Sequence, residues 1–480
     1  MSEQDSPVRE PAVTAHTLTL PSGALRYEAR ADWMTLYSDD KPSAEVFHVA
    51  YTLCDAPDRP LTFVFNGGPG AASAYLHLGV LGPRRVFFND DGSLPPSPAR
   101  VIDNPQTWLQ FTDLVFIDPV GTGFSRTLER EGEEPAAAEK RKKHYWTVEG
   151  DLDAMGEVIR RYLSRHQRWG SPIYLAGESY GGFRVARMAR RLQEQDGVGL
   201  CGALLISPAI EFDLLGGSAY NVLPWIDKLP TMAAAGLHHG RAALAGETRA
   251  EHLAEAERFA LEELTVALAA GDALSSARRA EIYNKMAGLI GLPASLIARC
   301  AGRVEMTRFC RELLRDQGLV CGLYDASVTV RDPFPSSEQF GGPDPTLAGL
   351  SRIFTAAVMS YLTAELAVTE SVRDYHLLSM SVNQSWRDGE GELRTDLVGS
   401  MSELRYGMSL NPDMKVMIVH GSYDLVTPYF SSWRLVALGQ LTESQRRAVF
   451  LRHYPGGHMF YTWAESRRAF FHDTAALYAR

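Results

Sequence analysis

One pentapeptide constrains the fold of this 480-residue chain more than any other feature: GESYG at residues 177–181. The apolar run Ile173–Ala176 before it predicts a short buried strand, and residues 182–192 after it predict a helix. A serine between small residues at such a junction forms a nucleophile elbow, a tight turn that exposes the hydroxyl above the sheet. The pattern also occurs by chance in ordinary glycine-rich turns, but its setting favours the elbow. Ser179 would then be the nucleophile, and the Tyr180 amide would face a developing oxyanion.

Short apolar runs alternate with helical patterns on both sides of this elbow. A helix is predicted at Val148–Arg165, and further strands are predicted at Leu61–Phe65, Leu114–Ile117, Gly202–Ser207 and Lys415–Val419. Fully apolar strands separated by helices are typical of sheets that are covered on both faces. The sequence therefore predicts the α/β class, with a mostly parallel central sheet and helices on both of its faces.

The alternation of strands and helices stops in the middle of the chain. Apolar positions three and four apart predict helices at 247–269 and 275–290, and the helical pattern resumes over 346–378. We therefore expect one α/β domain interrupted by a helical lid. The predicted organisation is a loose N-terminal arm (1–20), a first core segment (21–210), the lid (211–378) and a second core segment (379–480).

The overall charge narrows the classes of partner. A net charge of −10 argues against nucleic acid as the main partner, because no basic surplus is available to neutralise phosphates. The basic run at 141–144 is interpreted as part of a solvated, charged loop. Residues 1–16 lack the pattern of a secretion signal, and no run of 18 residues is apolar throughout. We therefore expect neither a signal peptide nor a membrane-spanning segment.

The five cysteines are widely spaced and follow no signal peptide, which predicts a reducing compartment and hence a cytoplasmic protein. A bridge from Cys310 to Cys300 or to Cys321 stays open at this point. No C-x-x-C pattern occurs, and the adjacent histidines His238 and His239 lack a pattern of further ligands. No metal or organic cofactor is expected.

A nucleophilic serine needs a base, and the base needs an orienting acid. In α/β-hydrolases these residues follow in the order Ser, Asp, His, each after a strand. Asp424 follows the strand predicted at Lys415–Val419, and His458 lies in a glycine loop after the apolar stretch 448–451. Each residue alone is more often a turn or surface residue, but their order and placement favour catalysis. The competing residues are His420, His453 and Asp413.

The loop NGGPG at residues 66–70 follows an early predicted strand. Its glycines would let backbone amides approach a substrate closely and supply a second oxyanion donor, as HGGG-type loops do in esterases. One such donor contributes about 3–4 kcal/mol to transition-state stabilisation. The plain alternative is a structural turn.

Together these residues resemble the serine carboxypeptidase family of the α/β-hydrolase superfamily. Its motifs are matched by NGGPG (66–70), DPVGTGFS (118–125), GESYGG (177–182) and GHM (457–459). The stretches GSYDLVTPYF (421–430) and YPGGHMFY (454–461) look most like the bacterial branch of the family. The resemblance covers most of the chain from about residue 60 and is weakest in the lid.

The resemblance implies specific roles, beginning with Ser179 as nucleophile, His458 as base and Asp424 as its orienting acid. The oxyanion amides would be those of Gly68 and Tyr180. The carboxylate of a peptide substrate would be held at a site made of Asn66, Gly67 and Glu178. Because an acid that faces an anionic substrate must be protonated to bind it, we expect a raised pKa for Glu178 and activity at acidic pH.

The chain departs from the family pattern at two places near NGGPG. Val80 stands where the family usually has a second glutamate, and Ala71 stands where a cysteine is common. Losing a like-charged neighbour lowers the pKa of Glu178, whereas an apolar Val80 raises it. The net direction of the pKa shift therefore stays open. Selectivity for a terminal carboxylate stays open with it. Arg184 would either replace the missing ligand or form an ion pair with the lid.

The sequence thus predicts a serine-type carboxypeptidase that cleaves the last peptide bond of peptides through an acyl-enzyme. Two alternatives are kept. The first is an esterase, amidase or acyltransferase that uses the same three residues. The second is a non-catalytic binding protein on a hydrolase scaffold, against which the intact Ser179, Asp424 and His458 argue. The oligomeric state and the preferred side chains are not indicated by the sequence.

Overall fold

The computed structural model describes residues 9–54, 56, 58–337, 341–369, 374–388 and 399–479. Residues 1–8 of the expected N-terminal arm and residues 389–398 of the expected second core segment lie outside these ranges.

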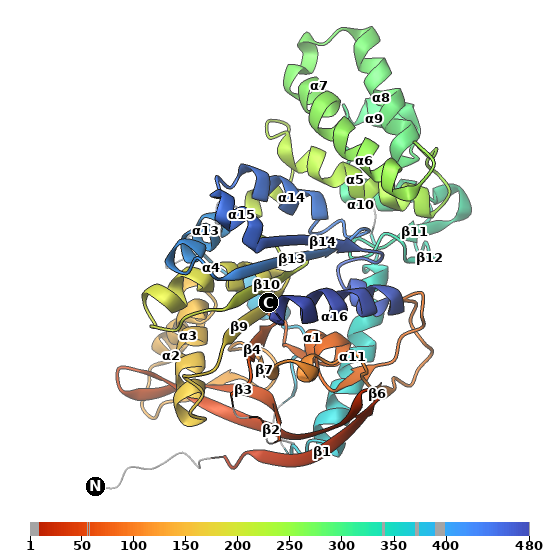
Figure 1. Ribbon diagram of the computed structural model, residues 1–480. Helices are drawn as coiled ribbons and strands as arrows, with labels where there is room; N and C mark the ends of the chain where they lie inside the picture. Colours follow the sequence, from red (N-terminus) through yellow and green to blue (C-terminus); the bar gives the residue numbers. More distant parts are fainter. Residues whose placement is uncertain are drawn as a thin grey trace.

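A twisted ten-stranded sheet forms the centre of the molecule (Figure 1). Its strand order is β1-β2-β3-β7-β4-β9-β10-β13-β14, with the two-residue β8 (Arg126–Thr127) paired to β3. The strands from β7 to β14 in this order are parallel to one another, whereas β1, β2, β3 and β7 pair in antiparallel fashion. The strands are β1 (Ala12–Leu20), β2 (Gly23–Ser38), β3 (Lys41–Leu53), β4 (Leu61–Phe65), β7 (Asp113–Ile117), β9 (Ile173–Glu178), β10 (Gly202–Ile206), β13 (Lys415–Gly421) and β14 (Val449–Tyr454).

The central strands are mostly apolar because both of their faces are buried. On β4, Phe63 and Phe65 belong to the apolar cluster of one face, and Val64 belongs to the cluster of the other. On β7, Val115 and Phe116 divide between the two clusters in the same way. Each fully buried side chain of this size stabilises the fold by about 1.5–3 kcal/mol. The sheet is therefore anchored by two separate cores.

Helices cover both faces of the sheet (Figure 1). Residues of α3, α4 and α13 belong to one apolar cluster, and residues of α16 and of α11 (Pro345–Ala364) belong to the other. This arrangement is the α/β-hydrolase fold, so the predicted fold class is confirmed. The core helices are α1 (Ala74–Leu76), α2 (Pro135–His144), α3 (Val148–Arg165), α4 (Tyr180–Glu194), α12 (Met380–Ser385), α13 (Met401–Leu410), α14 (Tyr429–Leu438), α15 (Glu443–Ala448) and α16 (Ala464–Tyr478).

The chain between β10 and β13 carries a helical lobe with its own apolar core, which we call the cap (residues 223–331). Figure 1 shows it above β13 and β14. Tyr423 and Tyr429 of the core domain extend into this apolar cluster and join the two parts. The cap contains α5 (Leu223–His238), α6 (Arg249–Phe259), α7 (Thr265–Ala270), α8 (Ser276–Ile290), α9 (Ala294–Arg299), α10 (Met306–Glu312), β11 (Leu319–Cys321) and β12 (Thr329–Arg331).

Helix α11 (Pro345–Ala364) follows the cap and lies beside α1 (Figure 1). Among the described helices it is long and apolar enough, by length and composition, to cross a membrane. Arg352 and several serines and threonines interrupt its apolar residues, so it contains no unbroken apolar run. In this structure Ile353, Phe354 and Tyr361 of α11 are buried in the core cluster.

Several expectations from the sequence are wrong in detail. The expectation of a loose N-terminal arm over residues 1–20 is wrong from Ala12 onward, because Ala12–Leu20 pairs with β2 along its whole length. The basic run 141–144 ends a helix, α2, rather than lying in a loop. The helix expected over 346–378 ends at Ala364.

All five cysteines are free, so neither of the bridges left open is present. The cytoplasmic location and the bacterial branch stay predictions.

A buried ion pair joins α3 to α4. The Arg184 guanidinium donates to both carboxylate oxygens of Asp151, at 2.7 and 3.1 Å. Their side chains are only 1% and 2% exposed. Removing one partner of such a pair leaves an uncompensated buried charge, which destabilises proteins by about 3–5 kcal/mol.

We predict that Asp151→Ala lowers the free energy of unfolding by about 3–5 kcal/mol, because Arg184 then stays buried without its counter-charge. The measurement is urea denaturation at neutral pH. The double variant Asp151→Leu/Arg184→Met is expected to recover most of the loss. A decrease below about 1 kcal/mol in Asp151→Ala would contradict this account.

Candidate active site

Ser179 occupies a strained turn between β9 and α4. Its φ of 61° lies in the left-handed region, which costs of order 1–3 kcal/mol for a residue other than glycine. The turn is compact enough to require glycines on both sides. A Cβ on Gly177 would lie 2.1 Å from the Gly181 carbonyl oxygen, and a Cβ on Gly181 would lie 2.7 Å from the Phe65 carbonyl oxygen. The predicted elbow is therefore present.

The NGGPG loop meets this elbow directly. A Cβ on Gly67 would lie 2.4 Å from the Tyr180 amide nitrogen, so only glycine permits the approach. Tyr180 is the first residue of α4, and its amide has no acceptor within the helix. Gly68 has a φ of +100°, which places it in a conformation that favours glycine. Gly67 and Gly68 thus line the same pocket as Ser179.

His458 and Asp424 are in contact. His458 Nδ1 donates to Asp424 Oδ2 at 2.7 Å, and both side chains are almost completely buried. Asp424 Oδ1 accepts from the amides of Val426 and Thr427, and its Oδ2 also accepts from the Thr427 hydroxyl at 2.6 Å. These bonds hold the carboxylate in one orientation, so the imidazole presents Nε2 away from Asp424.

The surroundings of His458 favour its charged form. Burial alone would lower the pKa of His458, but the charge and hydrogen bond of Asp424 and the charge of Glu178 outweigh it. The pKa of His458 is therefore raised above its usual value. This is the behaviour required of a base that carries a proton transiently during a reaction.

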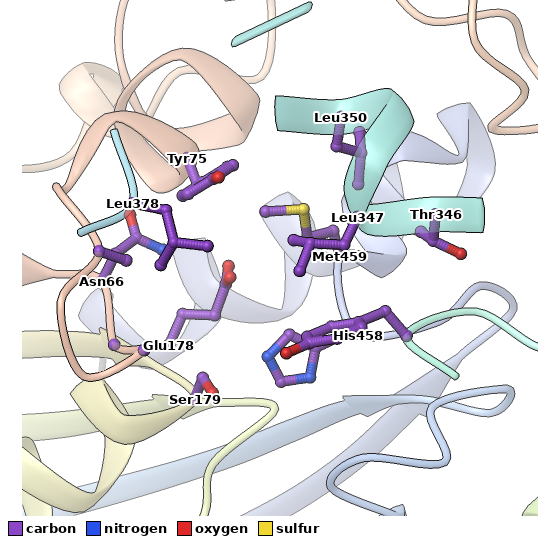
Figure 2. Close-up of a pocket in the computed structure, with 14 residues that line it drawn as sticks. Asn66, Tyr75, Glu178, Ser179, Thr346, Leu347, Leu350, Leu378, His458 and Met459 are labelled. Carbon is purple, nitrogen blue, oxygen red and sulfur yellow. The ribbon is translucent and has the colours of Figure 1, made fainter. Parts of the chain in front are cut away.

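A pocket of about 550 Å3 opens above Ser179. Figure 2 shows Ser179 and His458 at its floor, with Asn66, Glu178 and Tyr75 along one side. The opposite side is formed by apolar residues, among them Leu347, Leu350 and Met459. Of the expected site residues, those that line this pocket are Asn66, Gly67, Gly68, Glu178, Ser179 and His458. Asp424 lies behind His458, and the side chain of Tyr180 is buried.

Glu178 points into the pocket as a buried acid (Figure 2). Burial raises the pKa of Glu178 to about 7, although nearby His458 and a hydrogen bond from Tyr461 lower it. The Tyr461 hydroxyl donates to Glu178 Oε2 at 2.6 Å. The sequence left open whether the pKa of Glu178 is raised or lowered, and in the structure it is raised. Val80 is fully buried among apolar neighbours and does not line the pocket.

Asn66 is oriented by its own loop. Its Oδ1 accepts from the Leu76 amide at 2.9 Å, which leaves Nδ2 as the end that can serve a ligand. The Asn66 carbonyl accepts from the guanidinium of Arg184 at 2.9 Å. Arg184 therefore neither replaces the missing glutamate nor pairs with the lid. It pairs with Asp151 of α3 and supports Asn66 from beneath.

The DPVGTGFS motif supports the NGGPG loop from the end of β7. Asp118 Oδ1 accepts from the Ser73 amide at 2.8 Å, and the Ser73 hydroxyl donates to the Ile117 carbonyl. The Ser125 hydroxyl donates to the Asp118 carbonyl at 2.6 Å. This motif therefore has a structural role beneath the pocket.

The competing histidines are engaged elsewhere. His420 is fully buried and contacts the Thr427 carbonyl at 3.0 Å and the Ser432 hydroxyl at 2.8 Å. His453 contacts the Ser422 hydroxyl and stacks on Tyr429. Within the described ranges, no group of three or more His, Cys, Asp or Glu side chains could hold a metal ion.

A second, larger chamber of about 1110 Å3 adjoins the pocket. The two share Thr346, Leu350 and Met459 as walls. The chamber is bounded by the cap and by the loop that contains Ser93, and its lining includes His238 and Trp463. Sequence reasoning did not find it, because its walls come from five segments that are distant in the sequence.

The fold and this pocket define an α/β-hydrolase with a serine, a histidine and an acid gathered at the carboxyl ends of its strands. The chain belongs to the serine carboxypeptidase family, whose model matches residues 23–468. The family resemblance inferred from the sequence is confirmed.

Individual relatives are distant. Serine carboxypeptidase S10 family member 1 of Dictyostelium discoideum is 25% identical over 195 residues, which cover 38% of this chain and 42% of that protein. The pheromone-processing carboxypeptidase KEX1 of Yarrowia lipolytica is 26% identical over 400 residues, which cover 79% of this chain and 52% of that protein. The matches thus span about half or less of these relatives.

Among solved structures, the crystal structure of VinJ aligns with a TM-score of 0.37 and 12% identity, over 93% of this chain and 98% of that chain. The fold assignment therefore stands on the strand order of the sheet rather than on this likeness.

Proposed function

We propose that this protein is an active serine carboxypeptidase that releases the last residue of a peptide through an acyl-enzyme on Ser179. The observation that carries the proposal is that Ser179 and His458 share one pocket with a buried carboxyl group, Glu178. A nucleophile beside an acid that can be neutral suits a substrate whose scissile bond lies one residue from a carboxylate. Membership of the family supports the same activity.

In the proposed reaction, His458 Nε2 takes the proton of Ser179 as the hydroxyl attacks the peptide carbonyl. Asp424 keeps the imidazole in the required tautomer and stabilises the imidazolium. The amides of Gly68 and Tyr180 receive the oxyanion, and each is worth about 3–4 kcal/mol in the transition state. His458 then protonates the leaving amine, and water releases the acyl group by the reverse route.

The carboxylate of the leaving residue is proposed to bind Asn66 Nδ2 and protonated Glu178. Tyr461 holds Glu178 in place by its hydrogen bond to Oε2. Below pH 7 Glu178 keeps its proton and donates it in a hydrogen bond to the substrate carboxylate. Above pH 7 it ionises and repels that carboxylate. Binding of free peptides therefore weakens as the pH rises.

The side chain of the leaving residue is proposed to lie against the apolar wall of the pocket, beside Leu347, Leu350 and Met459. A short apolar side chain ends there. A longer one continues between Leu350 and Met459 into the second chamber. We therefore infer that peptides ending in long side chains are substrates alongside those ending in short apolar ones.

We predict that the wild-type protein removes residues stepwise from the carboxyl end of N-blocked peptides, and that Ser179→Ala lowers kcat at least about 10⁴-fold without unfolding. Mass spectrometry of digests and circular dichroism provide the measurements. An N-blocked dipeptide, its C-terminal amide and its ethyl ester are compared in parallel. Hydrolysis of the ester alone would favour an esterase, and hydrolysis of none of them would favour a binding protein.

We predict that kcat/KM for a free dipeptide falls as the pH rises through about 7, whereas kcat/KM for the corresponding ester does not. Glu178→Gln should abolish this fall, because glutamine donates its hydrogen bond at every pH. Tyr406→Phe, an exposed tyrosine far from the pocket, is the control. An unchanged profile in Glu178→Gln would refute the assignment.

We predict that Ser93→Trp, which places a large side chain in the second chamber, lowers the ratio of kcat/KM for a C-terminal arginine over that for a C-terminal alanine by about tenfold. Ser93→Ala is the matched control and should keep the wild-type ratio. Ser93 lies on an exposed turn, so the fold should tolerate both changes. Equal ratios in all three proteins would show that the chamber does not receive the substrate.

A further inference from the structure

The loop between β11 and β12 contains a short segment that lies between the loop of Asp424 and the loop of His458. We call this segment, Leu323–Ala326, the strap. It belongs to the cap, about 100 residues before the loop of Asp424 and about 130 residues before the loop of His458. None of its contacts was suggested by the sequence.

The strap first pairs with the loop that contains Asp424. The Leu425 amide donates to the Leu323 carbonyl at 3.1 Å, and the Ala326 amide donates to the Tyr423 carbonyl at 3.0 Å. The two residues that flank Asp424 are therefore bonded to opposite ends of the strap. These bonds are independent of those that the carboxylate of Asp424 accepts.

The middle of the strap bonds to the loop that contains His458. The His458 amide donates to the Tyr324 carbonyl at 2.5 Å, and the Gly457 amide donates to Asp325 Oδ2 at 2.9 Å. The contact is close enough that a Cβ on Gly457 would lie 2.2 Å from the Tyr324 carbonyl oxygen. The Tyr324 ring also meets the His458 imidazole edge to face, with centroids 5.3 Å apart.

Asp325 is the one strap residue whose side chain makes such a bond to a catalytic loop. It is buried, with 4% of its surface exposed. Its Oδ1 accepts from the amide and hydroxyl of Ser327, while its Oδ2 accepts from Gly457. Burial raises the pKa of Asp325 to about 6, although its hydrogen bonds with Ser327, Gly457 and Trp463 lower it. At neutral pH both oxygens therefore remain acceptors.

We propose that Asp325 is a positioning residue for the Ser179–His458–Asp424 reaction, holding the glycine loop before His458 against the loop of Asp424. The inference rests on the proposed function of those three residues. A loop with consecutive glycines, Gly456 and Gly457, has wide conformational freedom of its own. The 2.7 Å contact between His458 and Asp424 persists because the strap bonds both loops at once.

The assignment gives the cap a second role. Besides forming a wall of the substrate chamber, it supplies the segment that brings base and orienting acid together. A displacement of about 1 Å in such a constellation can lower a rate about 10²-fold. Changes in the strap should therefore act on turnover rather than on substrate affinity.

The test is Asp325→Ala, which removes the bond to Gly457. We expect kcat per active site to fall about 30- to 100-fold, with KM changed less than about threefold. The rate at which a fluorophosphonate labels Ser179 should fall in parallel. In a plot of the labelling rate against pH, the fall on the acidic side should shift to lower pH, because a looser contact with Asp424 lowers the pKa of His458. Labelling to completion counts the folded sites, so loss of folding is separated from loss of turnover.

Asp325→Asn is the second variant and Asp316→Ala is the control. Asparagine has one acceptor and one donor where the site needs two acceptors, so a three- to tenfold fall in kcat is expected. Asp316 is an exposed cap residue, and its loss should change neither rate. Should Asp325→Ala fail to fold, Asp325→Asn decides alone.

The proposal would be overturned if the folded Asp325 variants labelled Ser179 at the wild-type rate and with the wild-type dependence on pH. The labelling readout does not depend on the substrate. Wild-type protein that labels at Ser179 but cleaves no peptide would contradict the proposed carboxypeptidase activity and leave the strap test valid. Failure of labelling in the wild type would contradict both.

Discussion

The close approach of two glycine-rich turns is the constraint on which the rest of the site depends. Gly67 lies where any side chain would collide with the Tyr180 amide, and Gly177 and Gly181 remove the same obstacle within the elbow. β4 and β9 are paired parallel strands, so the contact lies where both of them end, beneath one pocket. The strain at Ser179 is sustained by the parallel sheet on either side, since its amide donates to the Ile206 carbonyl of β10 at 2.9 Å.

The other half of the site is assembled from segments that share no strand with the elbow. Asp424 and His458 follow β13 and β14, and they are held in register by the strap from the cap. Glu178 stands between the halves, close enough to His458 for each to affect the pKa of the other. The cap and the core domain therefore form one functional unit, joined at the residues that carry the proposed chemistry.

Local steric motifs made much of this structure predictable. The elbow, the glycine loop and the order of Ser179, Asp424 and His458 depend on short stretches of sequence, and the structure places them together as expected. Residues that act through distant partners were not predictable. The sequence around Arg184 does not indicate its ion pair with Asp151. The sequence around Asp325 likewise does not indicate its hydrogen bond with Gly457. The first three strands were also missed; β1 and β2 mix buried and exposed positions, whereas β3 is mostly buried and its sequence pattern was overlooked.

The antiparallel extension of the sheet has a consequence for handling the protein. β1 is the outermost strand on its side, and its nine residues contain no charged side chain. An N-terminal deletion that removed it would leave the sixteen-residue β2 as an open edge, with its backbone amides and carbonyls free to pair with another molecule. Because β1 already presents an uncharged outer edge and β2 carries Arg26, Glu28, Arg30 and Asp32, such a deletion would exchange an uncharged edge for a charged one, which resists pairing better.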